Sequence, residues 1–578
     1  MNETLLIETV GYTLRLSGER SLEFNLQDGR DAIIRSPRPL LLCPSVAGVT
    51  PVLDQLEIMH LPDNSHGMRC VRLRCPLSGT RNGWVENTLY SEQRRLVVRA
   101  RYQLDGAHAL ERWEIVPAGA MLLADTLQIY MGQHPTSGDG RILDLSNAEF
   151  STASHNWAYC SLAPRVLLKR RGLSLCIGGT AVHHDYGLLG KVREGKVESL
   201  YFDYGGKEFP HPMADGGPHD GPRLQLQITN GLTDHQAHAA FTRAMIDDGV
   251  ISPKRYRPED DAWERPWYCT WGDQMWLAGD GFRQNVSGGV DYQKIKAVLT
   301  HDWILETARR IRAEKLNIGT FIIDDGWQDY RGDWNLVVKR IPDMRKLVDE
   351  LHSLDFKVVL WWAPVELEKD ARNLSNPELV SGPSRYGLSV NDPNPANTTI
   401  FDYSKPVAQE WLRNKLHLWF GSEPGNWHID GLKIDFFMEK IAPSSVRGDV
   451  NWRGEEQLFT RLYKLIYETA SRYTESPGIM SGPWNPHLIP YLTTVFLEER
   501  FDTDYSSLYS KEAIRDAMMP GMRITPHFVY YPEANTGYLR AARYLDAVPQ
   551  IGVLQAPAMT AEALDNTRQG LAENFVCQ

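Results

Sequence analysis

Carboxylates follow three apolar runs in the second half of the chain, at the points where those runs end. Asp324 and Asp325 end the run IGTFIIDD, Asp435 ends GLKID, and Asp502 and Asp504 lie in the segment FLEERFDTD. Two carboxyl groups flanking one bond supply the chemistry of glycoside cleavage, since one attacks the anomeric carbon and the other protonates the leaving oxygen. The spacing therefore makes these residues candidates for a glycosidase site.

The neighbours of each carboxylate suggest its role. Lys433 lies two residues before Asp435, on the same face of an extended segment, where a cation depresses the pKa of a carboxyl group and keeps a nucleophile ionised. Asp502 lies close to other acidic residues, which favours the protonated form that an acid catalyst needs. A buried structural ion pair, an Asx turn at Asp324-Asp325 and a helix cap at Asp502 are the alternative interpretations.

Aromatic residues accompany these carboxylates. Only three of the 17 tryptophans precede Trp263. Trp271 and the pair Trp361-Trp362 end two further apolar runs. Sugar C–H faces stack on aromatic rings, and carboxylates accept hydrogen bonds from hydroxyl groups, so tryptophans together with carboxylates suit a neutral carbohydrate ligand. The alternative for the tryptophans is that they are ordinary core residues.

The pattern of elements changes between two parts of the chain. Residues 1–255 read as many short strands with period-two alternation and no convincing helix, which predicts a large N-terminal β-sandwich. A polar, Pro-containing stretch at 252–261 is the candidate linker. In residues 262–578, short apolar runs alternate with amphipathic helices, which predicts a catalytic domain of about eight β/α units.

Eight such units predict a (β/α)₈ barrel of the TIM type. A doubly wound open sheet is the second choice, but no Gly-rich phosphate turn follows the first strand. In a barrel the active site lies at the C-terminal ends of the strands, which is where the carboxylates and tryptophans fall.

Composition narrows the class of protein. The 578 residues exceed one compact domain, and a net charge of −11 disfavours binding to nucleic acid or to anionic membranes. The seven cysteines form no C-x-x-C pair and no zinc-type spacing. The first residues lack a secretory signal pattern, and no run is long enough to span a bilayer. We expect a reduced, cytoplasmic protein with no metal and no cofactor, of undetermined oligomeric state.

The motifs IIDDGWQ (322–328), DGLKIDFF (430–437) and WYCTW (267–271) resemble glycoside hydrolase family 36, the family of α-galactosidases and of raffinose and stachyose synthases. The K-x-D pattern is also shared with the related families 27 and 31. The resemblance covers about residues 262–578 and implies a retaining α-glycosidase without a metal, with a β-sandwich before its barrel.

The resemblance also implies a role for each matching residue. Asp435 matches the nucleophile and Lys433 a lysine that contacts the sugar. Asp324 and Asp325 match a pair that binds distal hydroxyls, with Trp327 as the adjacent aromatic residue. The acid/base falls in RFDTDY, where Asp502 is the better match and Asp504 the alternative.

Some segments depart from the family pattern. The stretch MSGPWNPH (480–487) replaces a Cys/Ser/Gly-rich segment, and LEER (497–500) replaces a Trp-containing one. Arg500, Arg372, Trp484 and His487 are therefore candidates for recognising a modified or anionic sugar, with loop scaffolding as the alternative.

The sequence leaves several functions open. Hydrolysis of a terminal α-glycoside, α-galactosides first, is the leading hypothesis. Transglycosylation to an acceptor sugar would use the same residues, and a non-catalytic carbohydrate-binding protein on the same scaffold is a further alternative. A metal-dependent hydrolase would need an H-x-H or H-E-x-x-H pair, which neither His428 nor His487 forms.

Overall fold

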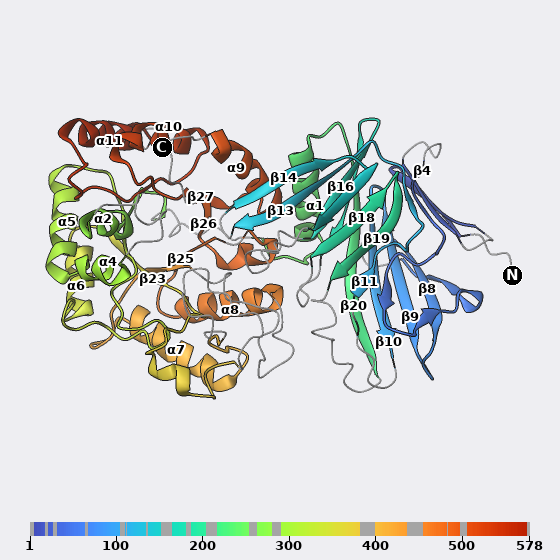
Figure 1. The fold of residues 1–578 in the computed structure, drawn as a ribbon, viewed down its shortest axis with the longest axis horizontal. Helices are drawn as coiled ribbons and strands as arrows, with labels where there is room; N and C mark the ends of the chain where they lie inside the picture. Colours follow the sequence, from blue (N-terminus) through green and yellow to red (C-terminus); the bar gives the residue numbers. More distant parts are fainter. Residues whose placement is uncertain are drawn as a thin grey trace.

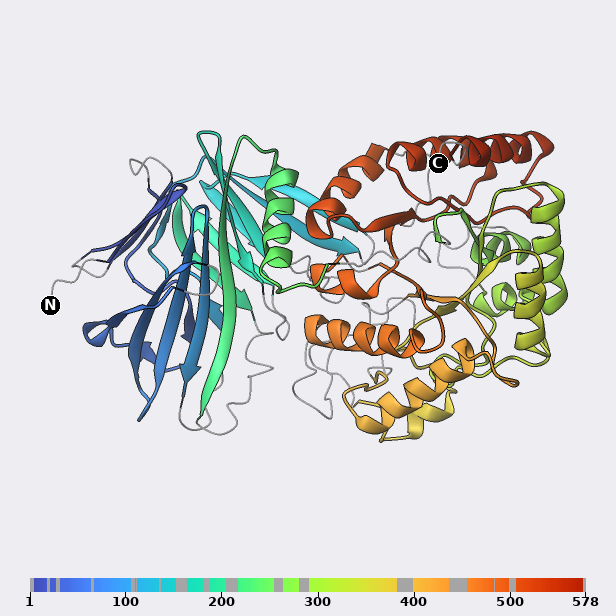
Figure 2. The same ribbon diagram turned by 180° about the vertical axis from the view of Figure 1, so that it is seen from behind.

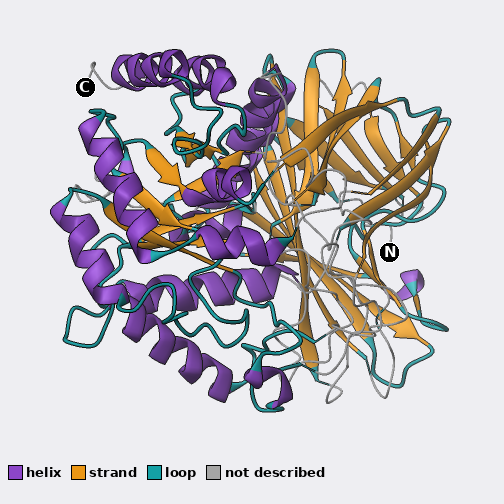
Figure 3. Ribbon diagram, turned by 60° about the vertical axis from the view of Figure 1, so that its left-hand side comes forward, coloured by secondary structure: helices purple, strands orange, loops and turns teal. Residues whose placement is uncertain are grey.

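The computed structural model describes residues 5–17, 21–26, 32–63, 67–104, 110, 112–134, 137–151, 164–180, 187–203, 217–253, 263–279, 291–381, 399–435, 455–482, 484–497 and 506–574. Within them, one half of the molecule is built of strands, and in the other half helices surround strands (Figure 1, Figure 3). Figure 2 shows the same two halves side by side from behind.

Two antiparallel sheets form the N-terminal half. Among the described residues, ten strands make the first sheet: β1 (Leu6–Glu8), β2 (Tyr12–Leu16), β3 (Leu22–Leu26), β4 (Ala32–Ser36), β5 (Cys43–Ser45), β11 (Arg112–Glu114), β12 (Met121–Leu122), β15 (Asn147–Ser151), β18 (Leu188–Arg193) and β19 (Lys196–Asp203). The second sheet contains β6 (Thr50–Pro51), β7 (Glu57–Leu61), β8 (Arg69–Ser78), β9 (Trp84–Glu92), β10 (Arg95–Gln103), β13 (Thr126–His134), β14 (Ser137–Leu143), β16 (Arg165–Arg170), β17 (Leu173–Gly179) and β20 (Pro218–Asn230).

The period-two pattern explains how these sheets pack. In β10, Leu96, Val98 and Ala100 are buried while Arg99 and Arg101 are exposed, because successive side chains of a strand point to opposite faces. Buried residues of both sheets, such as Phe24 of β3, join one hydrophobic cluster. The predicted β-sandwich is confirmed.

The C-terminal half is an eight-stranded parallel barrel. In the described residues its strands are β21 (Trp267–Cys269), β22 (Thr320–Ile323), β23 (Lys357–Trp362), β24 (Gly431–Ile434), β25 (Gly478–Ser481), β26 (Thr494–Leu497), β27 (Arg523–Pro526) and β28 (Gln550–Ile551). β21 pairs with both β22 and β28. On the far side, the backbone N–H of Val548 donates to Ile524 O at 2.9 Å, which joins the approach to β28 to β27. The predicted barrel is confirmed.

Helices surround these strands in Figure 1. The described helices of this half are α2 (Thr270–Leu277), α4 (Tyr292–Val298), α5 (His301–Ala313), α6 (Met344–Ser353), α7 (Pro406–Phe420), α8 (Glu455–Ala470), α9 (Ser506–Met518), α10 (Asn535–Tyr544) and α11 (Ala561–Asn574). Short 3₁₀ helices of this half are η4 (Arg372–Ser375), η6 (Pro486–Tyr491) and η7 (Pro532–Ala534), while η1 (Leu53–Gln55) lies in the N-terminal half. One apolar cluster fills the barrel, and a larger one lies between strands and helices.

The expectation of no helix before residue 255 is wrong. Helix α1 (Asp234–Asp247) begins with a capping box in which Thr233 and Gln236 satisfy each other's backbone N–H groups. Its buried face contains Phe241 and Met245, but also His238 and Thr242, and these polar residues hid the helical period.

Helix α1 also joins the two halves. Thr242 Oγ1 donates to Ala517 O of α9 at 2.8 Å, and Arg165 Nη1 of β16 donates to Thr242 Oγ1 at 2.8 Å. Helix α9 also contacts β14. The predicted domain boundary, between residues 255 and 262, lies outside the described residues and stays a prediction. No helix in the described part of the chain is long and apolar enough to cross a membrane.

Candidate active site

Four of the predicted site residues meet at the C-terminal ends of neighbouring barrel strands. Asp324 directly follows β22, Trp361 lies in β23, and Lys433 and Asp435 lie in and directly after β24. The parallel register sets Trp361 beside Lys433. Because the strands are parallel, their C-terminal ends share one rim of the barrel, which is where such barrels carry their sites.

Asp324 and Lys433 form a buried ion pair. Lys433 Nζ lies 2.8 Å from Asp324 Oδ2, and both residues are 2% exposed. Burial opposes the charge of the ammonium group, but Asp324, and after it Cys269 and Asp435, raise the pKa of Lys433 above its ordinary value. Lys433 therefore remains a cation at neutral pH.

Cys269, the last residue of β21, adds a donor to the same carboxylate. Its Sγ lies 3.1 Å from Asp324 Oδ2. Burial, and then the charge of Asp324, raise the pKa of this thiol well above its ordinary value, so it keeps its proton. One oxygen of Asp324 thus accepts from both a thiol and an ammonium group.

Asp435 is held by a tryptophan rather than by the lysine. Trp361 Nε1 donates to Asp435 Oδ2 at 2.9 Å, and the backbone N–H of Asp435 donates to Trp362 O at 2.9 Å. Unlike Asp324, Asp435 is only partly buried. Its carboxylate is therefore positioned from β23 and accessible from outside, as a nucleophile must be. Lys433 makes its hydrogen bond across β23 to Asp324, and the charge of Asp435 contributes less to its pKa than that of Asp324.

Asp325 has a different set of partners. Arg331 Nη2 lies 2.5 Å from Asp325 Oδ2, Lys296 Nζ lies 3.7 Å from Oδ1, and Gln328 also donates to Oδ1. Burial raises the pKa of Asp325, but Arg331 and Lys296 outweigh it and hold that pKa below its ordinary value. The carboxylate therefore stays ionised inside a network of cations.

Arg331 links this network to the nucleophile candidate. Its Nη1 lies 2.5 Å from Glu366 Oε2, in the loop after β23, and its guanidinium lies 5.0 Å from the centre of the Trp361 ring. Trp361 in turn bonds Asp435. The sequence interpretation missed Arg331, Lys296 and Glu366, because ion pairs across loops leave no periodic signal.

Trp327 and Trp271 differ in their accessibility. Trp327 is fully buried, donates from Nε1 to Trp361 O at 2.9 Å, and packs edge-on against Trp419 and Trp427. It offers no exposed ring face to a sugar in this structure. Trp271 lies in the first turn of α2, because β21 ends at Cys269 rather than continuing as expected. Its half-buried ring stacks on Tyr292.

The remaining predicted residues fall into two groups. Arg500, Asp502 and Asp504 lie outside the described residues, so their positions stay predictions. Trp484 is buried and donates to Phe496 O at 2.9 Å, which ties the loop after β25 to β26. His487 is also buried, and burial lowers its pKa to about 4, so it carries no charge at neutral pH. Arg372 is exposed on η4.

A family model covers the middle of the barrel. Residues 281–479 match the Glycosyl hydrolases family 31 TIM-barrel domain. Curated relatives match at low identity. The 1,4-alpha-glucan branching enzyme of Mycobacterium tuberculosis (strain ATCC 25177 / H37Ra) is 24% identical over 250 residues, which are 37% of this chain. That of Synechococcus sp. (strain CC9605) is 25% identical over 206 residues, which are 33% of this chain. The matched part is 32% and 26% of those enzymes, so the chain spans about a third or less of their length.

Solved structures match over nearly the whole chain. The family 36 α-galactosidase AgaA of Geobacillus stearothermophilus superposes with a TM-score of 0.64 at 12% identity, over 99% of this chain and 86% of that one. The α-galactosidase of Lactobacillus brevis gives 0.60 at 10% identity, over 99% and 83%. TtGalA of Thermus thermophilus gives 0.52 at 15% identity, over 89% and 94%. The predicted relationship is thus confirmed at the level of the fold: the chain has the architecture of the family 36 glycoside hydrolases, and residues 281–479 of its barrel match the family 31 barrel domain.

Proposed function

We propose that this chain is a retaining α-glycosidase that hydrolyses terminal α-glycosides, with α-galactosides as the foremost substrate class. The observation that carries the proposal is the Asp435 carboxylate, which ends β24 on the catalytic rim, is partly exposed and accepts a hydrogen bond from Trp361. The barrel match supports it, as do the similar structures of α-galactosidase AgaA from Geobacillus stearothermophilus in complex with raffinose or with stachyose.

The reaction would proceed by double displacement. An Asp435 oxygen attacks the anomeric carbon while the bond to the leaving oxygen breaks, and Asp502 gives its proton to that oxygen. Water then attacks the glycosyl–Asp435 ester as Asp502 takes the water proton, which releases the sugar and restores both carboxyl groups. Asp504 is the alternative acid/base, and retention requires a separation of about 5–5.5 Å between the two carboxyl groups.

The buried carboxylates would select the sugar. Asp324 accepts from Lys433 and Cys269 beside Asp435, so its position suits binding of hydroxyl groups on the glycone. Asp325 is held by Arg331 and Lys296. We propose that it contributes to sugar selection mainly through the negative charge and the shape that it gives the rim.

A panel of aryl α-glycosides tests the proposal. It should cover galacto-, gluco-, xylo-, N-acetylated and sulfonated sugars, and proton NMR should follow the anomer released first. We expect turnover of at least one α-glycoside with the α-anomer formed first. Initial release of the β-anomer would overturn the retaining mechanism, and absence of turnover across the panel would overturn the glycosidase. Reactions with added acceptor sugars separate hydrolysis from transglycosylation, which would yield a longer oligosaccharide.

A further inference from the structure

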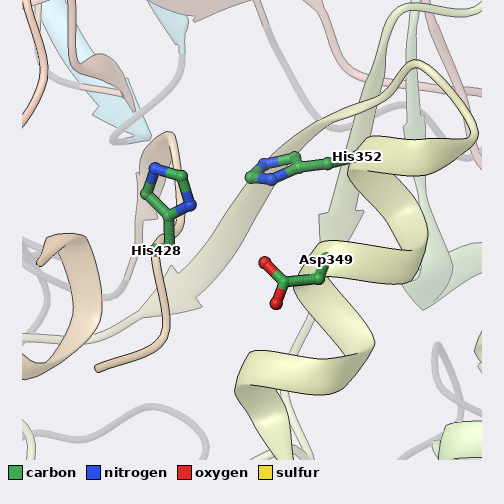
Figure 4. A group of neighbouring side chains, drawn as sticks. All are labelled: Asp349, His352 and His428. Atoms are coloured by element: carbon green, nitrogen blue, oxygen red, sulfur yellow. The ribbon is translucent and has the colours of Figure 1, made fainter. Parts of the chain in front are cut away.

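Three side chains of metal-binding types meet at the end of the barrel opposite the catalytic rim. Asp349 and His352 lie on the last turns of α6, and His428 lies three residues before β24. One ligand atom from each lies within 4.8 Å of the others. Figure 4 shows the two imidazole rings near each other with the carboxylate of Asp349 beside them, and the rings are perpendicular at 87°. They lie near the N-terminal ends of β23 and β24, whereas Asp435 follows the C-terminal end of β24.

The ligand types suit a borderline divalent cation. Zn²⁺ takes imidazole nitrogen and carboxylate oxygen at about 2.0–2.2 Å, and three protein ligands with water in a fourth position are common. Ca²⁺ and Mg²⁺ prefer sites made only of oxygen. In a tetrahedral zinc site the ligand atoms lie about 3.3 Å apart, so the three groups need to approach one another by up to about 1.5 Å. The side chain of Asp349, 51% exposed, has room to move.

A second layer of contacts orients His352. Its Nε2 lies 2.8 Å from Asp430 Oδ2, and Asp430 also accepts from Lys357 Nζ at 2.9 Å and from the backbone N–H of Val358 at 2.8 Å. When Nε2 donates to Asp430, Nδ1 keeps its lone pair for a cation. A carboxylate that fixes the second nitrogen of a histidine is the usual partner of a metal-binding imidazole.

The backbone holds His428 in an uncommon conformation. Its φ is +61°, in the left-handed region that non-glycine residues rarely adopt. Hydrogen bonds anchor both neighbours, from Trp427 N to Leu418 O at 2.8 Å and from Ile429 N to Trp419 O at 2.9 Å. Such conformations persist where the surroundings fix them, and they are frequent at functional sites. Here the constraint directs an imidazole towards α6.

The guanidinium of Arg345 opposes a cation at this place. Its Nε lies 2.9 Å from both oxygens of Asp349, and its Nη1 donates to Ser422 O at 2.8 Å. A bound cation would share the carboxylate with Arg345, taking one oxygen each. His352 and His428 also border a surface hollow of about 400 Å³, which leaves space for water on the metal.

We propose that Asp349, His352 and His428 form a Zn²⁺ site that ties α6 to the segment before β24. This inference is independent of the proposed glycosidase activity, because the site lies at the other end of the barrel strands. Zn²⁺ would stabilise the fold there without contacting the sugar, by binding the native chain and not the unfolded one.

Titration of the chelator-treated full chain with ZnCl₂ tests the site by calorimetry. We expect one Zn²⁺ per chain, with affinity at least tenfold weaker in His428→Asn and in His352→Gln. Asparagine tolerates the left-handed conformation, and glutamine keeps an N–H for Asp430, so both variants preserve the local structure. His60→Asn, at an exposed histidine of β7, is the matched control and should bind as the wild type does.

A Co²⁺ spectrum and a third variant test the site independently of the calorimetry. Co²⁺ in place of Zn²⁺ should give the visible absorption of a tetrahedral site in the wild type and lose it in His428→Asn. If either histidine variant fails to fold, Asp349→Asn on the exposed surface of α6 replaces it. Failure of the wild type to bind Zn²⁺, or unchanged affinity in folded His428→Asn and Asp349→Asn, overturns the proposal.

Discussion

Lys433 of β24 bonds Asp324, which directly follows β22, reaching across the intervening strand at 2.8 Å inside the barrel. Asp435, two residues further along the same strand face, instead accepts from Trp361. The two carboxylates of the rim therefore have different hydrogen-bond partners. Asp324 is compensated by a buried cation, whereas Asp435 is held by a neutral donor and stays accessible, which matches the different tasks proposed for a binding and a reacting group.

The buried pair predicts a strong and asymmetric response to mutation. Lys433→Met leaves the Asp324 carboxylate buried without its cation, which should destabilise the protein by about 3–5 kcal/mol. The double variant Asp324→Asn/Lys433→Met removes both charges and should recover most of that loss. Urea unfolding of the wild type, both single variants and the double variant measures the coupling. Additive losses in this cycle would show that the two groups do not depend on each other.

The hydrogen bond from Trp361 predicts a loss of activity with little loss of stability. Trp361→Phe keeps an aromatic ring beneath Arg331 but removes the N–H that Asp435 accepts. A hydrogen bond to a charged group contributes about 1.5–3 kcal/mol, so kcat/KM should fall about 10–100-fold. Trp362→Phe, one residue along on the helix-facing side of β23, is the control for packing. A similar fall in kcat/KM in both variants would show that the hydrogen bond from Trp361 to Asp435 does not contribute to activity beyond packing.

Much of the fold could be predicted because the barrel strands and helices obey their periods. The sequence predicts strands over Gly478–Ser481 and Thr494–Leu497, which are the bounds of β25 and β26, and a helix over Pro342–Leu354. Helix α6 begins two residues after Pro342, since Asp343 caps it through the backbone N–H of Lys346. Helix α1 could not be recognised from apolar spacing because buried polar residues interrupt its inner face. Its capping box was the available signal.

The sequence could predict which residues of the site come together, because the ends of the parallel strands determine that, but not which partner each side chain bonds. The meeting of Asp324, Lys433 and Asp435 follows from the shared rim of parallel strands. Which partner each side chain bonds depends on reach across the barrel, so the two-residue spacing of Lys433 and Asp435 could not predict that Lys433 bonds Asp324. Trp327 is equally instructive, because the turn after Asp325 directs its ring into the helix layer, against Trp419.

The acid/base assignment predicts a dependence on the leaving group. Asp502→Ala should slow hydrolysis of alkyl or sugar leaving groups by about 10²–10⁴-fold, since they need a proton. A dinitrophenyl glycoside needs none, so its first step should be nearly unaffected. Azide should then accelerate turnover and yield the α-glycosyl azide, because it attacks the glycosyl–Asp435 ester where water would. The same pattern in Asp504→Ala, with Asp502→Ala unaffected, would transfer the role to Asp504.

Acid sensitivity of the fold should come in part from His487. Burial lowers its pKa from 6.5 to about 4, so the unfolded chain binds a proton at a pH where the folded chain does not. Stability from this residue is complete above pH 6.5 and is lost as the pH falls towards 4. At about 1.4 kcal/mol for each pH unit, the full effect is about 3 kcal/mol.

Urea unfolding between pH 7 and 4.5 tests this. The free energy of unfolding of His487→Gln should fall less with pH than that of the wild type, while His417→Gln, at an exposed position on α7, should follow the wild type. Parallel pH curves for wild type and His487→Gln would exclude this histidine as a source of acid sensitivity.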